Sequence, residues 1–277
     1  MSQSEHGPRT DDGEQVVVRL RGASIGYSDR AVVRDVDLTV RRGDVLAVLG
    51  ANGSGKTTLV RGLLGLATVL SGEALVLGQT VGARATRGRI GYVPQRQTVA
   101  GTIPSTVREV VASGRLPRRR LLGRRTAADR EAVTRAIAAV ELQHWADTDI
   151  AQLSGGQQRR ALIARALASE PDVMIMDEPT AGVDRASQQA LAASITRLVD
   201  RGVTLLVVTH EVGPLAGVLT RSVVVRDGRI VHDGQLLQAG ATVPAVPDAH
   251  EDDAHHLDDP ADADQSAGWL EHPLGER

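Results

Sequence analysis

The sequence predicts an α/β protein: a three-layer sandwich around a parallel sheet, with an antiparallel β region and an inserted helical subdomain. Continuous apolar runs at 45–50, 173–177 and 204–210 are typical of strands that are buried on both faces. Segments with helical spacing alternate with these runs, and such alternation is typical of parallel sheets. A helical block at about 96–152 interrupts the alternation, which indicates an inserted subdomain.

The remaining elements follow from local patterns. TAADREAVTRAIAAVEL (126–142) has a threonine that can cap a helix and apolar residues at helical spacing. Ser154 is placed to cap a further helix that runs to about Ala168. Asp227-Gly228 favours the turn of a hairpin over 222–231. The other expected strands are 16–20, 37–40, 73–78 and 89–93, and the other expected helices are 56–66 and 185–200.

Composition limits the class of protein. The chain has 277 residues and no cysteine, so disulfides and thiolate metal sites are excluded, which fits a reducing compartment. No apolar run approaches the roughly 20 residues that are needed to cross a bilayer. Residues 1–15 are polar and lack an apolar signal core, so we expect a disordered leader. A membrane role would depend on another chain that spans the bilayer.

Charge is unevenly distributed along the chain. The net charge is −2, yet residues 241–277 hold ten acidic residues and one basic residue, so the rest of the chain is basic. A basic body favours an anionic ligand, a nucleic acid or an anionic membrane face, and charge alone does not choose among them. The tail is rich in Asp, His and Pro, and we expect it to be disordered. The folded domain is therefore predicted to span 16–240.

Residues 50–57 match the phosphate-loop pattern G-x-x-x-x-G-K-[ST]. The pattern follows an apolar strand and opens a helix, which is the context that a phosphate-loop NTPase requires. Its glycines let backbone N–H groups surround phosphate oxygens, and Lys56 reaches the β- and γ-phosphates. Lys56 is the only lysine among 32 basic residues, and the bulkier guanidinium of arginine is expected to fit this loop poorly. A glycine-rich turn with an incidental lysine is the alternative, which the strand-to-helix context disfavours.

Two further motifs carry chemistry. VMIMDEP (173–179) is an apolar strand followed by carboxylates, of which Asp177 is expected to hold Mg²⁺ and Glu178 to act as general base on the attacking water. The hydroxyl of Thr57 is expected on the same Mg²⁺. LSGGQ (153–157) places paired glycines after a capping serine, which makes a second anion cradle at a helix start. The alternatives are an acidic turn for the first motif and a helix C-cap or linker glycine pair for the second, and the phosphate loop makes both less favoured.

The segments GANGSGKTT, LSGGQ, VMIMDEP and Thr209-His210 together resemble the ATP-binding subunits of ABC transporters, over about Val16 to Gly234. The resemblance implies ATP and Mg²⁺ as ligands. It implies that Tyr27 stacks on adenine, that Gln95 contacts Mg²⁺ and water and senses the membrane subunit, and that His210 contacts the γ-phosphate. The catalytic residues are then Glu178, His210, Gln95 and Lys56, and the Mg²⁺ ligands are Thr57, Gln95 and Asp177. The nucleotide contacts are then Tyr27, Gly50, Asn52, Gly53, Ser54, Gly55, Lys56, Thr57, Thr58, Ser154, Gly155, Gly156, Gln157 and Asp184.

The resemblance also implies partners and a place in the cell. Two copies form a head-to-tail dimer, in which Ser154–Gln157 of one copy closes over the ATP held by Lys56 of the other. Asp184 lies in a loop that crosses between the copies. Hydrolysis opens the dimer and resets a pair of permease subunits, so the protein works at the cytoplasmic face of the membrane. An extracytoplasmic metal-binding protein is the further expected partner, and no nucleic acid is expected.

The cargo depends on weaker signals. Residues 91–125 and TAGVD (180–184) resemble the subgroup that serves zinc, manganese or iron uptake, so import of zinc or manganese is the leading hypothesis. HEDDAHHLDDPADAD (250–264) offers imidazole and carboxylate ligands that suit Zn²⁺ or Mn²⁺, and a merely solvating acidic tail is the equal alternative. The other open functions are an ABC ATPase for a lipid, drug or organic solute, a soluble non-transport ABC ATPase, and a non-catalytic metal-binding module.

Overall fold

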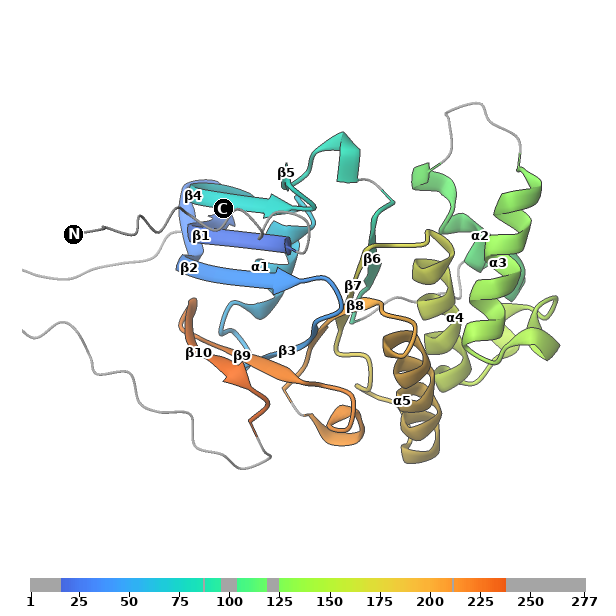
Figure 1. The fold of residues 1–277 in the computed structure, drawn as a ribbon. Coiled ribbons are helices and arrows are strands. Elements are labelled where there is room, and N and C mark those ends of the chain that lie inside the picture. Colours follow the sequence, from blue (N-terminus) through green and yellow to red (C-terminus); the bar gives the residue numbers. More distant parts are fainter. Residues whose placement is uncertain (1–15, 87, 96–103, 119–124, 211, 238–277) are drawn as a thin grey trace, which may run out of the picture. The chain divides into compact units, whose positions relative to one another are not determined.

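The structure, a computed structural model, describes residues 16–86, 88–95, 104–118, 125–210 and 212–237. The expected leader and acidic tail lie outside these residues, so the domain boundaries stay predictions. Figure 1 shows two sheets and a group of helices that is formed by the middle of the chain. Within the described residues, no helix has the length and apolar character that a membrane crossing needs.

A six-stranded mixed sheet carries the site, in the order β10-β9-β3-β8-β7-β6. Strands β6, β7, β8, β3 and β9 pair in parallel, whereas β10 is antiparallel to β9 and completes the predicted hairpin. The carboxyl ends of β3, β7 and β8 therefore open on one edge, where α/β proteins bind ligands. The bounds are β3 Val45–Leu49, β6 Ile90–Val93, β7 Val173–Asp177, β8 Thr204–Val208, β9 Arg221–Arg226 and β10 Arg229–Gln235.

A second, antiparallel sheet has the order β2-β1-β4-β5 and confirms the expected antiparallel region. Its bounds are β1 Val16–Tyr27, β2 Arg30–Arg41, β4 Thr68–Val76 and β5 Gln79–Thr80. β1 and β2 run well past the predicted strands 16–20 and 37–40, so the predicted lengths were wrong. The pairing of β1 with β2 contains register shifts, and Gly22 and Asp35 have positive φ. These irregularities let the two strands stay hydrogen-bonded through positions where the alternation of apolar residues is broken.

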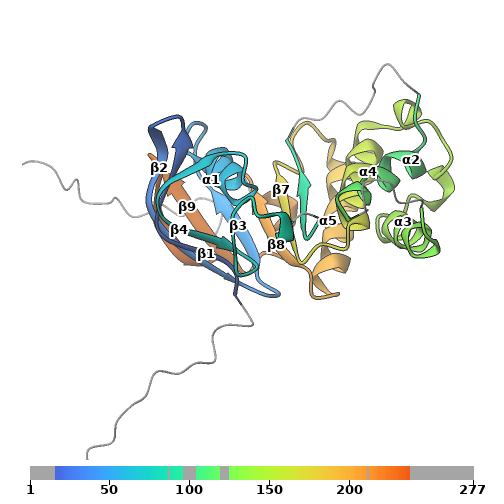
Figure 2. The ribbon, with the colours of Figure 1, turned by 90° about the horizontal axis from the view of Figure 1, so that it is seen from above.

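The central strands β3, β7 and β8 of the six-stranded sheet are buried on both faces, and their alternate residues face different layers. Met174, Met176 and Val207 pack against helices of the middle and late chain. Ile175 and Leu206 pack instead with α1 and the antiparallel sheet. Figure 2 shows α1 between the two sheets, with α4 and α5 beyond β7 and β8. The helices are α1 Lys56–Leu63, α2 Val107–Ser113, α3 Ala127–Ala139, α4 Gly155–Ala168 and α5 Arg185–Val199.

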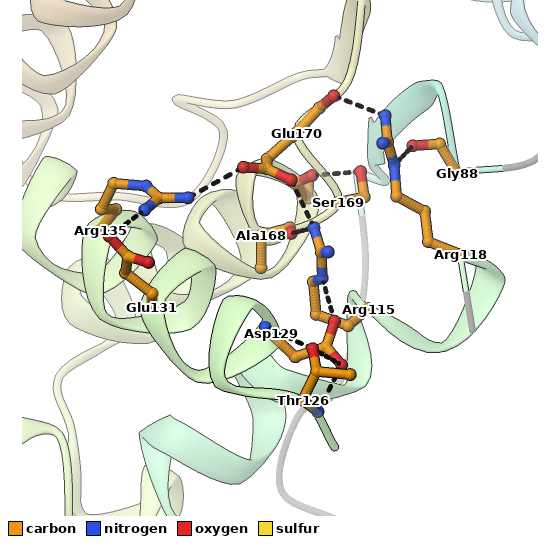
Figure 3. A network of polar contacts seen from close by, with 11 residues as sticks. Gly88, Arg115, Arg118, Thr126, Asp129, Glu131, Arg135, Ala168, Ser169 and Glu170 are labelled. Atoms are coloured by element: carbon orange, nitrogen blue, oxygen red, sulfur yellow. Dashed lines mark hydrogen bonds and ion pairs between the residues drawn. The ribbon is translucent and has the colours of Figure 1, made fainter. Parts of the chain in front are cut away.

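An ion-pair cluster joins the ends of α2, α3 and α4 (Figure 3). The guanidinium of Arg115 donates from Nε to Asp129 at 2.9 Å, and from Nη1 to the Glu170 carboxylate at 2.7 Å and the Ala168 carbonyl at 2.9 Å. Asp129 also completes a capping box with Thr126 at the start of α3. The Thr126 backbone N–H, followed by Arg115, lowers the pKa of Asp129 to about 2. The described part of the predicted helical subdomain is thus tied to the segment that leads into β7.

Candidate functional site

A glycine-rich loop joins β3 to α1 at the carboxyl edge of the six-stranded sheet. Gly50, Gly53 and Gly55 adopt φ values of 151°, 81° and 107°. At Gly50, an added Cβ would lie 2.3 Å from the Val225 carbonyl oxygen and 2.6 Å from the Ser54 hydroxyl oxygen. A larger residue at Gly50 would therefore force the backbone to move, so the path of this loop requires glycine at its first position.

Lys56 begins α1, and its side chain folds back into the loop. Its ammonium donates hydrogen bonds to the carbonyl oxygens of Gly50 (2.7 Å) and Ala51 (2.8 Å), and the residue is 7% exposed. Burial lowers the pKa of Lys56, while the nearby carboxylates of Glu178 and Asp177 act in the opposite direction. The ammonium of Lys56 is held at the N-terminus of α1, where the free backbone N–H groups also attract anions.

A cavity of about 270 Å³ lies against this loop. Its lining combines residues 52–58 with Gln95, which follows β6, and with Asp177 and Glu178 at the end of β7. Three segments that are far apart in the sequence thus bring the predicted phosphate-binding and acidic residues to one cavity.

The oxygen atoms around this cavity fit a magnesium-bound nucleotide. Thr57, Gln95 and Asp177 offer hydroxyl, amide and carboxylate oxygens, which is the donor chemistry that Mg²⁺ prefers. The Ser54 hydroxyl is buried and has no hydrogen-bond partner among the described residues. Because buried polar atoms are normally paired, this hydroxyl is suited to a ligand oxygen.

Two buried carboxylates stand at the end of β7. Asp177 and Glu178 are 4% and 6% exposed. Burial, followed by the charge of Glu178, raises the pKa of Asp177 above its usual value. Glu178 adopts a φ of 46°, which is uncommon outside glycine, and its N–H donates to the Val208 carbonyl at 2.8 Å. This turn brings Glu178 to the end of the neighbouring strand β8.

His210 follows β8 and meets Glu178 there. Nδ1 of His210 lies 3.0 Å from each carboxylate oxygen of Glu178. The hydroxyl of Thr209 donates to the same carboxylate at 3.4 Å. The side chain of His210 is 59% exposed, so one end of the imidazole contacts the buried acid while the ring remains accessible. Glu178 lines the cavity, whereas His210 lies outside its described lining and contacts it through Glu178.

The serine-glycine motif at 153–157 presents a different surface. Ser154 caps α4 in a capping box with Gln157, with bonds of 3.3 Å and 2.9 Å. An added Cβ at Gly155 would meet nothing within 4 Å, whereas one at Gly156 would lie 2.4 Å from Ser187. None of these motif residues is in the described lining of the cavity. In a single chain, the motif is thus separate from the phosphate loop.

Tyr27 and Asp184 also lie outside the described lining of the cavity. Tyr27 ends β1, is 40% exposed, and accepts a hydrogen bond from Arg61 at 3.0 Å. Asp184 caps α5 by accepting from the Ser187 N–H at 3.0 Å. The predicted roles of Tyr27 in adenine stacking and of Asp184 between subunits stay predictions.

The sequence interpretation overlooked Arg159. This residue lies on α4 and its guanidinium is buried against the backbone of Pro94–Gln95 and of residues 177–179. A signal was present: Arg159 falls in a buried helical stripe with Gly156, Ile163 and Ala166. A charged residue in such a stripe needs buried partners.

The sequence profile of the family described as "ABC transporter" matches residues 33–181. The manganese transport system ATP-binding protein MntB of Bacillus subtilis is 40% identical over 70% of this chain and 77% of its own length. The zinc transport system ATP-binding protein TroB of Treponema pallidum is 36% identical over 80% of this chain and 82% of its own. The ferric enterobactin transport ATP-binding protein FepC of Escherichia coli is 37% identical over 79% and 82%.

A solved structure of an ABC transporter component has a similar fold. CbiO1 of Clostridium perfringens, part of the ABC transporter complex CbiONQ, matches with a TM-score of 0.71 at 27% identity, over 80% of this chain and 89% of its own. The phosphate loop, the acidic end of β7 and the serine-glycine motif lie on a fold that this structure shares. The chain therefore belongs to the ABC transporter family, and it is an ATP-binding subunit, an ATPase, of such a transporter.

Proposed function

We propose that this ATPase powers the import of zinc or manganese ions through a pair of permease subunits. ATP-binding subunits of this family energise transport and pair with permease subunits. The observation that carries the cargo proposal is the similarity to MntB and TroB, which extends over 70% and 80% of this chain. The names of those two proteins state manganese and zinc transport.

The chemistry of the cavity supports a mechanism for hydrolysis. Lys56 and the loop N–H groups hold the β- and γ-phosphates of ATP. Thr57, Gln95 and Asp177 would hold Mg²⁺, which when bound would supply positive charge beside the phosphates. Glu178 accepts a proton from the attacking water, and His210 orients Glu178 through the 3.0 Å contact between them while it reaches the γ-phosphate.

The open surface of α4 supports a head-to-tail dimer. Ser154 and Gly155 are exposed, and their capped helix start suits an anion. We place this surface over the ATP that a second copy holds at its Lys56. Asp184 then lies at the junction of the two copies, and hydrolysis separates them. The dimer acts at the cytoplasmic face of the membrane on its permease subunits, and an extracytoplasmic metal-binding protein delivers the cargo.

A second candidate cargo is an iron chelate. FepC is 37% identical to this chain, and its name states ferric enterobactin transport. The ATPase chemistry of the nucleotide cavity is the same for either cargo. The His- and Asp-rich segment 250–264 is compatible with sensing or buffering Zn²⁺ or Mn²⁺, and a solvating tail is the alternative.

Uptake of radioactive Zn²⁺, Mn²⁺ and a ferric chelate by metal-starved cells of the native host tests the proposal. The compared strains express wild type, Lys56→Ala and Lys56→Arg at equal levels. We expect both variants to lose uptake of zinc or of manganese, and Lys56→Arg to fail because its guanidinium does not fit between the Gly50 and Ala51 carbonyls. Loss of chelate uptake alone would favour the second candidate. Unchanged zinc and manganese uptake would refute the proposed cargo.

A further inference from the structure

Arg159 makes an unusual set of contacts. It lies one turn into α4, is 8% exposed, and uses all five N–H donors of its guanidinium. The acceptors are the backbone carbonyl oxygens of Pro94 (2.6 Å), Gln95 (3.2 Å), Asp177 (2.7 Å), Glu178 (2.9 Å) and Pro179 (3.2 Å). One side chain thus binds two segments that are more than 80 positions apart in the sequence.

A buried cation at this position is costly. Burial lowers the pKa of Arg159, while Asp177 and its neighbours act in the opposite direction. The cost is offset only when every donor is satisfied with good geometry. The same helix stripe holds Gly156, Ile163 and Ala166, so an apolar residue would fill space here without a charge to desolvate. Packing alone therefore gives no reason for a guanidinium.

The segments that Arg159 joins each carry a part of the site. Gln95 lines the nucleotide cavity, and so do Asp177 and Glu178. The helix that carries Arg159 begins at the Ser154 cap, which belongs to the motif proposed to face the ATP of a second copy. A displacement of any one of these segments breaks bonds to the same guanidinium.

We propose that Arg159 is a positioning residue that fixes the Gln95 and Asp177–Pro179 segments to the start of α4. The inference rests on the proposed role of this cavity in ATP hydrolysis. Arg159 is not in the described lining of the cavity; it sets the position of Glu178 and Gln95 through their own carbonyl groups. Because the same bonds reach α4, a change at the Ser154 surface moves the residues of this subunit's own site.

The test compares ATP hydrolysis by the purified full-length chain in three variants: Arg159→Gln, Arg159→Lys and Arg115→Gln. Arg159→Gln removes most of the five bonds, and we expect kcat to fall about tenfold or more, while KM for ATP and binding of a fluorescent ATP analogue change less than about threefold. The hydrogen bonds of Arg159 go to residues 94–95 and 177–179 and not to the phosphate loop between β3 and α1, so we expect binding to be spared. Arg159→Lys keeps the charge with fewer donors and is expected to recover part of kcat.

Arg115→Gln is the matched control. It also removes a nearly buried arginine with bonds to a carbonyl and two carboxylates, but in the cluster at the ends of α2 and α3 (Figure 3). We expect it to lower the melting temperature and leave kcat within about twofold of wild type. A fall in kcat that merely follows the melting temperature in both variants would show that Arg159 is structural.

Hydrogen exchange gives a readout that does not need activity. In folded Arg159 variants we expect faster exchange of the amides of Val93 and Gln95 and of Asp177 and Glu178, with the amides of 50–58 unchanged. Normal exchange at both segments, or kcat within about twofold of wild type in Arg159→Gln, would overturn the inference. A different result would show that this cavity does not hydrolyse ATP: the wild type and Glu178→Gln would then hydrolyse ATP at equal rates.

Discussion

Nδ1 of His210 lies 3.0 Å from both carboxylate oxygens of Glu178, although 32 positions separate the two residues. Parallel pairing of β7 with β8 produces this contact, because each residue follows the carboxyl end of its strand. The imidazole is partly open to solvent while the acid is buried. One side of the imidazole thus contacts the acid while the rest of the ring stays accessible to solvent.

Replacing His210 with alanine should slow hydrolysis and spare ATP binding. The variant removes the group that orients Glu178, and the loss of one partner of an acid–base pair costs on the order of 10²-fold in kcat. Steady-state ATPase kinetics and fluorescent-nucleotide binding measure the two effects separately. His144→Ala, an exposed histidine in the turn after α3, is the control and should behave as wild type. Equal kcat values for His210→Ala and His144→Ala would show that His210 does not contribute to hydrolysis.

The adjacent glycines Gly155 and Gly156 should respond differently to alanine. A Cβ at Gly156 would lie 2.4 Å from both Cβ and Oγ of Ser187, so Gly156→Ala should destabilise the fold by about 1–3 kcal/mol. Gly155→Ala meets open space, so its free energy of unfolding should stay within about 0.5 kcal/mol of wild type. Urea denaturation of each variant measures the difference.

A compensating variant tests the cause of the Gly156 effect. Ser187→Gly removes the atoms that a Cβ at Gly156 would strike, so the double variant should recover part of the lost stability. Additive losses in the double variant would contradict the steric explanation. Gly155→Ala should impair closure of the proposed dimer over ATP, because the Gly155 surface faces the second copy there.

The charge of Asp129 should contribute stability that depends on pH. Its pKa is about 2 in the fold, mainly through the Thr126 backbone N–H and then Arg115, against about 3.9 in an unfolded chain. Because the folded pKa is the lower one, the contribution is complete above about pH 4 and is lost as pH falls through about 2. Asp129→Asn should therefore reduce the free energy of unfolding by about 1–2 kcal/mol at pH 7.

Denaturant titrations at pH 7, 5 and 3 check this prediction. The difference between wild type and Asp129→Asn should be the same at pH 7 and 5 and smaller at pH 3. Asp147→Asn is the control, because Asp147 pairs with Arg108 on the surface with its side chain 78% exposed, and it should have a much smaller effect. A difference that grows toward low pH would contradict the assignment.

Most of the fold was predictable because buried parallel strands leave a continuous apolar run. The strand 173–177 and the helix after Ser154 were predicted with the bounds that the structure has. β1 and β2 were underestimated because their outer face is polar and their pairing contains bulges, for example near Asp35. Pairing between backbones, unlike burial, leaves little trace in the residue pattern.

The grouping of the phosphate-loop and acidic residues at one cavity was predictable for a similar reason. Lys56 follows the loop after β3, and Asp177 and Glu178 stand at the end of β7, so local motifs with a known strand direction bring them to one edge. Arg159 was missed because its partners are carbonyl oxygens, which every residue carries. The contact of Gly156 with Ser187 was missed because it depends on how α4 packs on α5.

The most direct test of the account is sedimentation of Glu178→Gln with and without MgATP, combined with its rate of hydrolysis. Glutamine keeps the shape of the side chain and removes its basicity, so hydrolysis should fall about 10²–10⁴-fold while ATP still binds. We predict a monomer without ATP and a stable dimer with ATP, and a monomer in both conditions for Lys56→Ala/Glu178→Gln. A Glu178→Gln protein that stays monomeric with ATP and hydrolyses it at the wild-type rate would contradict the account.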